Sequence, residues 1–114
     1  MSSLEPHVSI QEHFENARRD IIFDVVKDLN DRNLHILLAV RKCQDDFAKS
    51  IYEKYRTISD EPFSYMHFYS SLSYLQSLGL VLLISTKINR TYTNRIQLTF
   101  DPEVLQTVCR LRFG

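Results

Sequence analysis

The chain has 114 residues, of which 44% are hydrophobic and 25% charged, values that are typical of one soluble globular domain and exclude a disordered chain. Fourteen Lys and Arg residues balance fourteen Asp and Glu residues, so the formal net charge is zero and a strongly basic nucleic-acid-binding domain is excluded. The charges are nevertheless uneven along the chain, because residues 60–83 contain no Lys or Arg whereas residues 84–114 contain five basic and two acidic residues. Any positive patch is therefore expected near the C-terminal end.

Missing motifs exclude several further classes of protein. The chain has only two Gly residues and neither a GxxxxGK[ST] nor a GxGxxG sequence, so no phosphate-binding loop is expected. The longest apolar run, Leu78–Ile84, is far shorter than the roughly 20 residues of a membrane span, and residues 1–10 do not have the pattern of a secretory signal. Cys43 and Cys109 make no disulfide framework, which favours a reducing compartment: the cytoplasm with its nucleoid or, in a eukaryote, the nucleus. Because the chain has no nucleophile motif, no carboxylate pair facing one site and no metal-ligand spacing among its His residues, we expect no catalysis, no cofactor and no metal.

Three helices are predicted in the first half of the chain. Ser9-Ile10-Gln11-Glu12 has the pattern of a capping box, and it precedes a helix predicted over residues 10–29. The apolar stripe of this helix recurs every three or four residues, at Ile10, Phe14, Ala17, Ile21, Val25 and Leu29. Asn30-Asp31-Arg32-Asn33 interrupts the helical pattern, and a second helix over residues 34–44 is apolar on several faces, which indicates a central position. A third helix is predicted over residues 49–58 and is followed by a turn at residues 59–62.

A fourth helix and a hairpin follow. Ser64 is the expected N-cap of a helix that presents Phe68, Leu72, Leu75 and Leu78 on one side, and Gly79 is expected to end it. Residues 80–84 are an apolar run of strand length, and residues 95–100 alternate between polar and apolar side chains. Residues 86–94 between them are polar and β-prone, so the whole stretch predicts a hairpin with a basic tip. A last helix then begins with Asp101 as its expected N-cap and Pro102 at its first position. Its docking residues are predicted to be Val104, Leu105, Val108, Cys109 and Leu111.

This order of elements predicts a mainly α fold with a small β-hairpin: a winged helix-turn-helix with an extra N-terminal helix and a C-terminal helix. We assign residues 1–30 to an N-terminal linker helix and residues 31–114 to the winged-helix domain. The helix just before the hairpin is the candidate recognition helix, and the hairpin tip is the candidate wing.

Four stretches have an order and spacing that are informative together: Val8-Ser9-Ile10 with His13 and Ala17, Leu34 to Val40, Ile51-Tyr52-Glu53-Lys54-Tyr55, and Glu61-Pro62-Phe63-Ser64-Tyr65 leading through Phe68, Leu72 and Leu75 to Leu78-Gly79-Leu80-Val81. These stretches resemble the C-terminal winged-helix domain of the archaeal Orc/Cdc-type replication initiators, relatives of the origin recognition complex. The resemblance spans about residues 8–104, and its order and spacing agree throughout. The resemblance implies origin recognition on duplex DNA, with residues 1–30 matching the end of the family's ATPase lid. The ATPase domain itself has no counterpart in this chain, so the resemblance implies no nucleotide hydrolysis here.

The chain departs from this family at both candidate DNA-contacting elements. Met66 and His67 stand where the family has a basic or polar pair, and the wing sequence Asn89-Arg90-Thr91 contains no Gly. Arg90 and Arg95 are expected to take the roles of the family's wing arginines. The predicted DNA-binding residues are Ser64, Tyr65, Met66, His67, Tyr69 and Ser70 of the helix, and Lys87, Asn89, Arg90, Thr91 and Arg95 of the wing.

Two functions stay open on the sequence. In the first, the fourth helix enters the major groove of duplex DNA and the wing contacts the minor groove or the backbone. In the second, the chain is a winged-helix protein–protein interaction module, or a domain like that of a transcription regulator, with little affinity for DNA. The uncharged helix with Tyr65, Met66 and Tyr69 suits a contact with other replication proteins or with a second copy of the chain. No membrane partner is expected.

Overall fold

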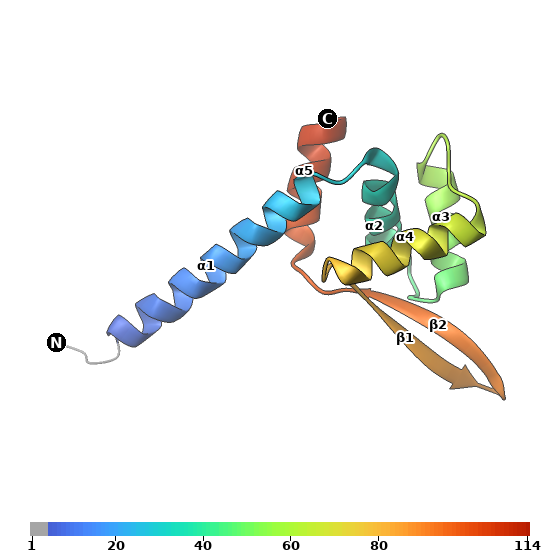
Figure 1. Ribbon diagram of the computed structural model, residues 1–114, viewed down its shortest axis with the longest axis horizontal. Coiled ribbons are helices and arrows are strands. Elements are labelled where there is room, and N and C mark those ends of the chain that lie inside the picture. The colour runs from blue at the N-terminus through green and yellow to red at the C-terminus, as the bar shows by residue number, and fades with distance from the viewer. Residues whose placement is uncertain (1–4) are drawn as a thin grey trace.

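The computed structural model describes the backbone of residues 5–114 and the side chains from residue 16 onward. Its elements follow the predicted order: α1 (Glu5–Lys27), α2 (Asp31–Lys42), α3 (Ala48–Ile58), α4 (Tyr65–Ser77), β1 (Val81–Ile88), β2 (Thr91–Leu98) and α5 (Pro102–Phe113). Figure 1 shows α2 and α3 side by side with α4 crossing them, the two strands projecting away below α4, and α1 extending outward from α5. The prediction of a mainly helical fold with one antiparallel hairpin is confirmed.

Local capping explains several helix boundaries. The Ser64 hydroxyl accepts a hydrogen bond from the backbone N–H of His67, and the Asp101 carboxylate accepts one from the N–H of Glu103, as predicted for the two N-caps. Gly79 follows α4 with φ +78°, the left-handed conformation in which a side chain would be strained. The predictions at these three positions are confirmed.

Two helices begin three or more residues earlier than predicted, and the first two helices also end two residues earlier, at Lys27 and Lys42. The first helix begins at Glu5 instead of Ile10, so Ser9 lies inside α1 and is not its N-cap; the side-chain bonds of the predicted capping box lie outside the described residues. Pro6 allows this earlier start, because a proline in the first helical turn needs no intrahelical N–H bond. The second helix begins at Asp31, three residues earlier than predicted, because Asn30 caps it by accepting from the N–H of Asn33.

The β-prone segment over residues 86–94 continues both strands, so the turn at the hairpin tip is short. The strands pair from Val81↔Leu98 to Ile88↔Thr91, which leaves only Asn89 and Arg90 as the turn. Both turn residues have positive φ, +50° and +70°, as a two-residue hairpin with a primed turn requires. The predicted polar tip is strand because β-branched Thr and Ile residues favour the extended backbone. The second strand also ends at Leu98, two residues earlier than predicted, although Phe100 is buried as expected.

One core unites all the helices. Side chains that are fully shielded from solvent include Leu34 and Leu37 of α2, Tyr55 of α3, Phe68 of α4 and Ile96 of β2. From α5 the structure confirms burial of Val104, Leu105, Val108 and Cys109, but Leu111 is 75% exposed, contrary to the prediction. Leu111 faces outward because its neighbours in the last turn face the body. Arg112 donates to the carbonyl oxygens of Lys27 and Leu29 and to the Asp31 carboxylate, while the Phe113 ring stacks on His35.

Among the described side chains of the predicted apolar stripe, from Ala17 to Leu29, burial is confined to the C-terminal end of α1. Val26 and Leu29, at and beyond the last turn of α1, are buried in the common core, and Val25 is half-buried. One turn earlier Ile21 is 65% exposed, and Ala17 is exposed as well. The division of the chain at residue 30 stays a prediction.

Candidate nucleic-acid interface

The turn that leads into α4 is held by two tyrosines of α3. The Tyr55 hydroxyl, on a fully buried side chain, accepts a hydrogen bond of 2.8 Å from the backbone N–H of Phe63. The Tyr52 hydroxyl donates one of 3.0 Å to the carbonyl oxygen of the same residue. Because both backbone polar groups of Phe63 are bound in this way, the start of α4 is fixed against α3.

The outward face of α4 carries no charged group. Its most exposed side chains include Met66 (81%) and Tyr74 (52%), with Ser70 and Ser73 between them. The Ser70 hydroxyl donates to the carbonyl oxygen of Met66, so its lone pairs are left as acceptors for an external donor. This face offers van der Waals contact and hydrogen bonding but no ion pairing.

Two of the predicted helix residues form a link to the hairpin. The Tyr69 hydroxyl lies 3.4 Å from the Tyr65 hydroxyl and accepts a hydrogen bond of 3.1 Å from the Asn94 side-chain amide on β2. The hydrogen bond to Tyr69, together with burial, raises the pKa of Tyr65 to about 12. The Tyr65 hydroxyl is therefore neutral at pH 7. Tyr69 is half-buried and holds the hairpin to α4, while Tyr65 stays 44% exposed.

Ser64 and His67 lie at the N-terminal end of α4, where both are exposed. The His67 ring stacks on Phe63 with 4.2 Å between ring centroids, and the Arg32 guanidinium lies 4.9 Å from the centroid of the Phe63 ring. Arg32 also pairs with Glu61 at 3.0 Å, so its charge is compensated locally.

Lys87, Asn89, Arg90 and Thr91 lie together at the end of the hairpin and are all exposed. Lys87 pairs with Tyr92 across the strands, and its ammonium group lies 5.6 Å from the centroid of the Tyr92 ring. Because side chains alternate along a strand, Lys87 and Tyr92 share the face of Asn94, the residue that contacts α4. Lys87 and Tyr92 therefore lie on the face of the hairpin that also contacts α4.

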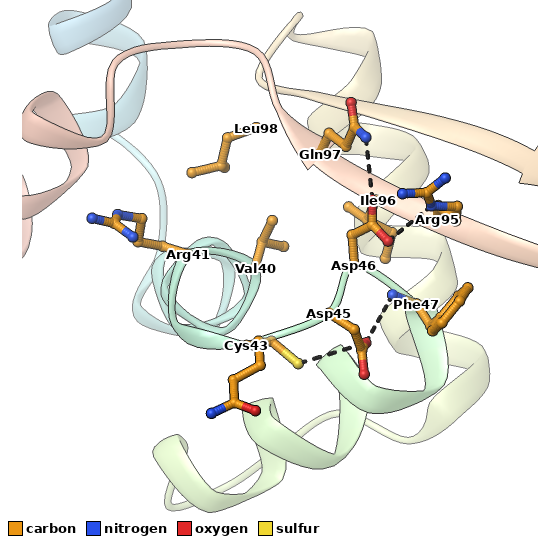
Figure 2. A pocket seen from close by; sticks show the side chains of 11 residues that line it. Val40, Arg41, Cys43, Asp45, Asp46, Phe47, Arg95, Ile96, Gln97 and Leu98 are labelled. Atoms are coloured by element: carbon orange, nitrogen blue, oxygen red, sulfur yellow. Dashed lines mark hydrogen bonds and ion pairs between the residues drawn. The ribbon is translucent and has the colours of Figure 1, made fainter.

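Arg95 is not part of this surface. Its Nε donates to one oxygen of the Asp46 carboxylate at 2.8 Å, and Gln97 donates to the other at 3.2 Å, as Figure 2 shows. The hydrogen bond from Arg95 is the largest cause that lowers the pKa of Asp46 from its ordinary 3.8. A backbone hydrogen bond adds to this contact: the N–H of Ile96 donates to the carbonyl oxygen of Asp46 at 2.8 Å. Arg95 thus lies midway along the hairpin, on the opposite face from Lys87, and fastens it to the loop between α2 and α3.

Sequence reasoning missed a cation beside the start of α4. The Arg56 guanidinium lies 5.9 Å from the centroid of the Tyr52 ring, and the Tyr52 ring lies 5.0 Å from that of Tyr65. The i, i+4 spacing of Tyr52 and Arg56 is the sequence signal that could have found it. Within residues 16–114, Arg56, Lys87 and Arg90 form no ion pair with a carboxylate, in contrast to Arg32 and Arg95.

From residue 5 onward no helix is long and apolar enough to cross a membrane, and no three or more His, Cys, Asp or Glu side chains of the described residues come together in a group that could hold a metal ion.

Comparisons with known proteins show the fold. No protein-family model matches the chain, and neither does any curated protein. Among solved structures, the Orc1 protein of Aeropyrum pernix in complex with DNA is similar, with a TM-score of 0.76 and 23% sequence identity. The match covers 90% of this chain but only 30% of the Orc1 chain. A MarR family transcription regulator is similar with a TM-score of 0.55 and 12% identity, over 98% of this chain and 76% of the regulator. The predicted winged-helix fold and its resemblance to the Orc/Cdc-type initiators are confirmed as a likeness of fold.

Proposed function

We propose that this chain is a duplex-DNA-binding module without catalytic activity, in which α4 lies in the major groove and the hairpin tip contacts the minor groove or the backbone beside it. The fold supports the proposal, since one structural neighbour was solved with DNA and the other is a transcription regulator. Such a module would act where the DNA is, in the nucleoid or in a nucleus.

The observation that carries the proposal is the conformation of Arg90. This residue has φ +70° at the second turn position of the hairpin, where Gly is the preferred residue. An arginine in the left-handed region costs about 1 kcal/mol relative to an ordinary backbone conformation. Its side chain is exposed at the far end of the hairpin, and it forms no ion pair within residues 16–114. A strained cation at the tip of a wing suits a contact with phosphate or with the electronegative minor groove.

The uncompensated charges predict modest, salt-dependent binding. Lys87 and Arg90 lie at the hairpin tip, and Arg56 lies beside the start of α4. If each neutralises one phosphate, the slope of log K against log salt is about −3, since each contact contributes about −0.9. The uncharged face of α4 would then contribute shape and apolar contact, with Met66 or Tyr65 against a thymine methyl and Ser70 accepting from a base amino group.

As a finer proposal, the module belongs to an origin-recognising initiator of the Orc/Cdc type. The higher TM-score with the Orc1 protein than with the MarR family regulator supports this over a transcription regulator. Since the chain corresponds to 30% of that Orc1 protein, the proposal concerns DNA recognition alone.

The test is fluorescence anisotropy with labelled duplex DNA across a series of salt concentrations. We expect Arg90→Ala, Lys87→Ala and Arg56→Ala each to reduce the salt slope by about one. Lys54→Ala is the matched control: it removes one exposed cation from the side of α3 away from Tyr52, and the slope should not change. Binding that is insensitive both to salt and to all three substitutions would contradict the assignment of the interface.

A second candidate function is favoured by the exposure of Met66 (81%) and Tyr65 (44%) on an uncharged helix face. Such side chains are enriched in the centres of protein–protein interfaces. If the chain shows no DNA binding at low salt, and Met66→Ser abolishes association with itself or with another replication protein, the protein-contact function is the correct one.

A further inference from the structure

The hairpin is held to the body at two levels, and its tip extends beyond both. At the first level Val81 and Ile96, near the ends of the strands that join the body, are buried in the common core. At the second level, midway along the strands, Asn94 and Arg95 bond to side chains of other elements. Among the described residues, no hydrogen bond or ion pair joins residues 86–93 to a helix or to the loop between α2 and α3. The midway contacts are therefore the last ones before the tip.

The two midway contacts hold the hairpin from opposite sides. Successive side chains of a strand point to opposite faces, so Asn94 and Arg95 leave β2 in opposite directions. Asn94 donates to the Tyr69 hydroxyl on α4 at 3.1 Å. Arg95 donates to Asp46 at 2.8 Å, and Figure 2 shows the Asp46 carboxylate between Arg95 and Gln97, which donates to its other oxygen. These two contacts, Tyr69–Asn94 and Asp46–Arg95, form the wing anchor, and tilting the hairpin in either direction strains one of them.

The length of the hairpin beyond the wing anchor makes its stiffness important. Arg90 comes four residues before Asn94, so at about 3.3 Å per residue it lies about 13 Å further out. Figure 1 shows the strands projecting away from the helices over this distance. A rotation of about 20° at the wing anchor would move the tip by about 5 Å, which exceeds the length of a hydrogen bond. Small changes at the wing anchor therefore become large changes in the place of the tip cations.

We propose that Asp46 and Tyr69 are positioning residues of the DNA interface, which hold the hairpin so that Lys87 and Arg90 meet the phosphates or the minor groove beside α4. This inference rests on the proposed DNA-binding function and names two residues that serve it through the hairpin. Asp46 is negatively charged and its carboxylate is occupied by Arg95 and Gln97, so its role is not a contact with DNA.

Charge alone predicts the opposite effect of Asp46. Replacing Asp46 by Ala removes a carboxylate that repels phosphate and releases the Arg95 guanidinium. A purely electrostatic role therefore predicts tighter DNA binding and a salt slope steeper by up to about one. Loss of the wing anchor predicts weaker binding and a shallower slope, because Lys87 and Arg90 lose their fixed positions. The direction of the change in the slope separates the two accounts.

The test is fluorescence anisotropy with labelled duplex DNA across a series of salt concentrations, on the whole chain carrying Asp46→Ala, Tyr69→Phe or both. We expect Asp46→Ala to weaken binding and to bring the slope from about −3 toward about −2. The two-fold variant should approach about −1, the slope that Arg56 alone would leave. In the two-fold variant Arg90→Ala should no longer change the slope, a coupling that a loss of stability by itself would not produce.

Two further variants guard this test. Asp46→Asn keeps the size of the side chain and loses the charge, so it should act in the same direction even if Asp46→Ala is poorly folded. Asp60→Ala is the matched control, because it removes an exposed carboxylate that makes no hydrogen bond or ion pair within residues 16–114. In the Asp60→Ala background, Arg90→Ala should keep its full effect on the slope. Far-UV circular dichroism confirms that each variant is folded.

Amide ¹⁵N relaxation of the chain without DNA measures the wing anchor directly. The order parameters of residues 86–93 should fall in the two-fold variant, while those of the helices stay as in the parent. Tighter binding by Asp46→Ala, an Arg90→Ala effect that persists in the two-fold variant, or unchanged order parameters at the tip would each overturn the proposal. A parent chain that does not bind DNA would refute the proposed function itself, whereas a parent that binds DNA together with variants that bind as it does would refute only the role of the wing anchor.

Discussion

Substituting Tyr55 by Phe tests the clamp that holds the turn before α4. The Tyr55 ring is fully buried and its hydroxyl accepts from the N–H of Phe63 at 2.8 Å. Phenylalanine keeps the volume of the ring, so the substitution leaves no cavity beyond the hydroxyl itself. It does leave a partly buried backbone N–H without its partner, which costs about 1–2 kcal/mol. For a domain of this size that loss corresponds to a fall in Tm of about 4–8 °C.

Urea unfolding followed by far-UV circular dichroism measures the change in the free energy of unfolding. Tyr52→Phe removes the donor to the Phe63 carbonyl from a half-buried site, so its cost should be smaller, about 0.5–1 kcal/mol. Tyr74→Phe is the matched control, because Tyr74 is 52% exposed and its hydroxyl makes no hydrogen bond within residues 16–114. If Tyr55→Phe unfolds within about 0.3 kcal/mol of the parent, the hydroxyl does not hold the turn and the reasoning is refuted.

Three other substitutions test the turn of the hairpin and two of the contacts that hold the elements together. Arg90→Gly should stabilise the chain by about 0.5 kcal/mol, because Gly adopts positive φ without strain. The same substitution should reduce the salt slope of DNA binding by about one, because it removes a cation. Thermal melts measure the first effect and fluorescence anisotropy the second, and a loss of stability would contradict the assigned turn. Asp46→Asn should cost at most about 1 kcal/mol at pH 7, since the pair with Arg95 is partly exposed. Because the pKa of Asp46 is lowered in the folded state, the carboxylate contributes fully to the free energy of unfolding above its ordinary pKa of 3.8, and this contribution is lost as the pH falls through the lowered pKa. The free energies of unfolding of parent and variant, measured in urea, should therefore converge in strong acid. A difference that stays constant with pH would exclude this ion pair as the cause. Arg112 donates to the carbonyl oxygens of Lys27 and Leu29 and to the Asp31 carboxylate. Arg112→Ala should therefore lower the free energy of unfolding, measured in urea, by about 1–3 kcal/mol. Arg110→Ala, at a nearby exposed position, is the control and should leave the free energy of unfolding nearly unchanged.

Local chemistry determined much of this protein from the sequence alone. The N-caps at Ser64 and Asp101 and the left-handed Gly79 act within a few residues of chain, so their consequences can be predicted without knowing the fold. The helical period of Phe68, Leu72 and Leu75 likewise predicted which side of α4 is buried. The order of these elements was sufficient to predict a winged helix.

The predicted ends of helices and strands were less accurate where two local sequence signals lie close together. The capping pattern at Ser9 was overridden by an earlier helix start at Glu5, with Pro6 in the first turn. The polar stretch over residues 86–94 formed strand up to a two-residue turn, because strand pairing satisfies its backbone and only Asn89 and Arg90 need positive φ.

Only the tertiary structure decided which cations are paired with a carboxylate and which can bind an external anion. Arg90 and Arg95 look equivalent in the sequence, but Arg95 meets Asp46, 49 residues earlier, and is compensated, whereas Arg90 projects from the end of the hairpin. In the same way Arg56 gained a candidate role only because Tyr52 of α3 packs against Tyr65 of α4. A sum over the sequence yields a net charge of zero, yet the field at a surface depends on the distance between each cation and its nearest carboxylate. Those distances are set by packing between residues far apart in the chain, which no local pattern records.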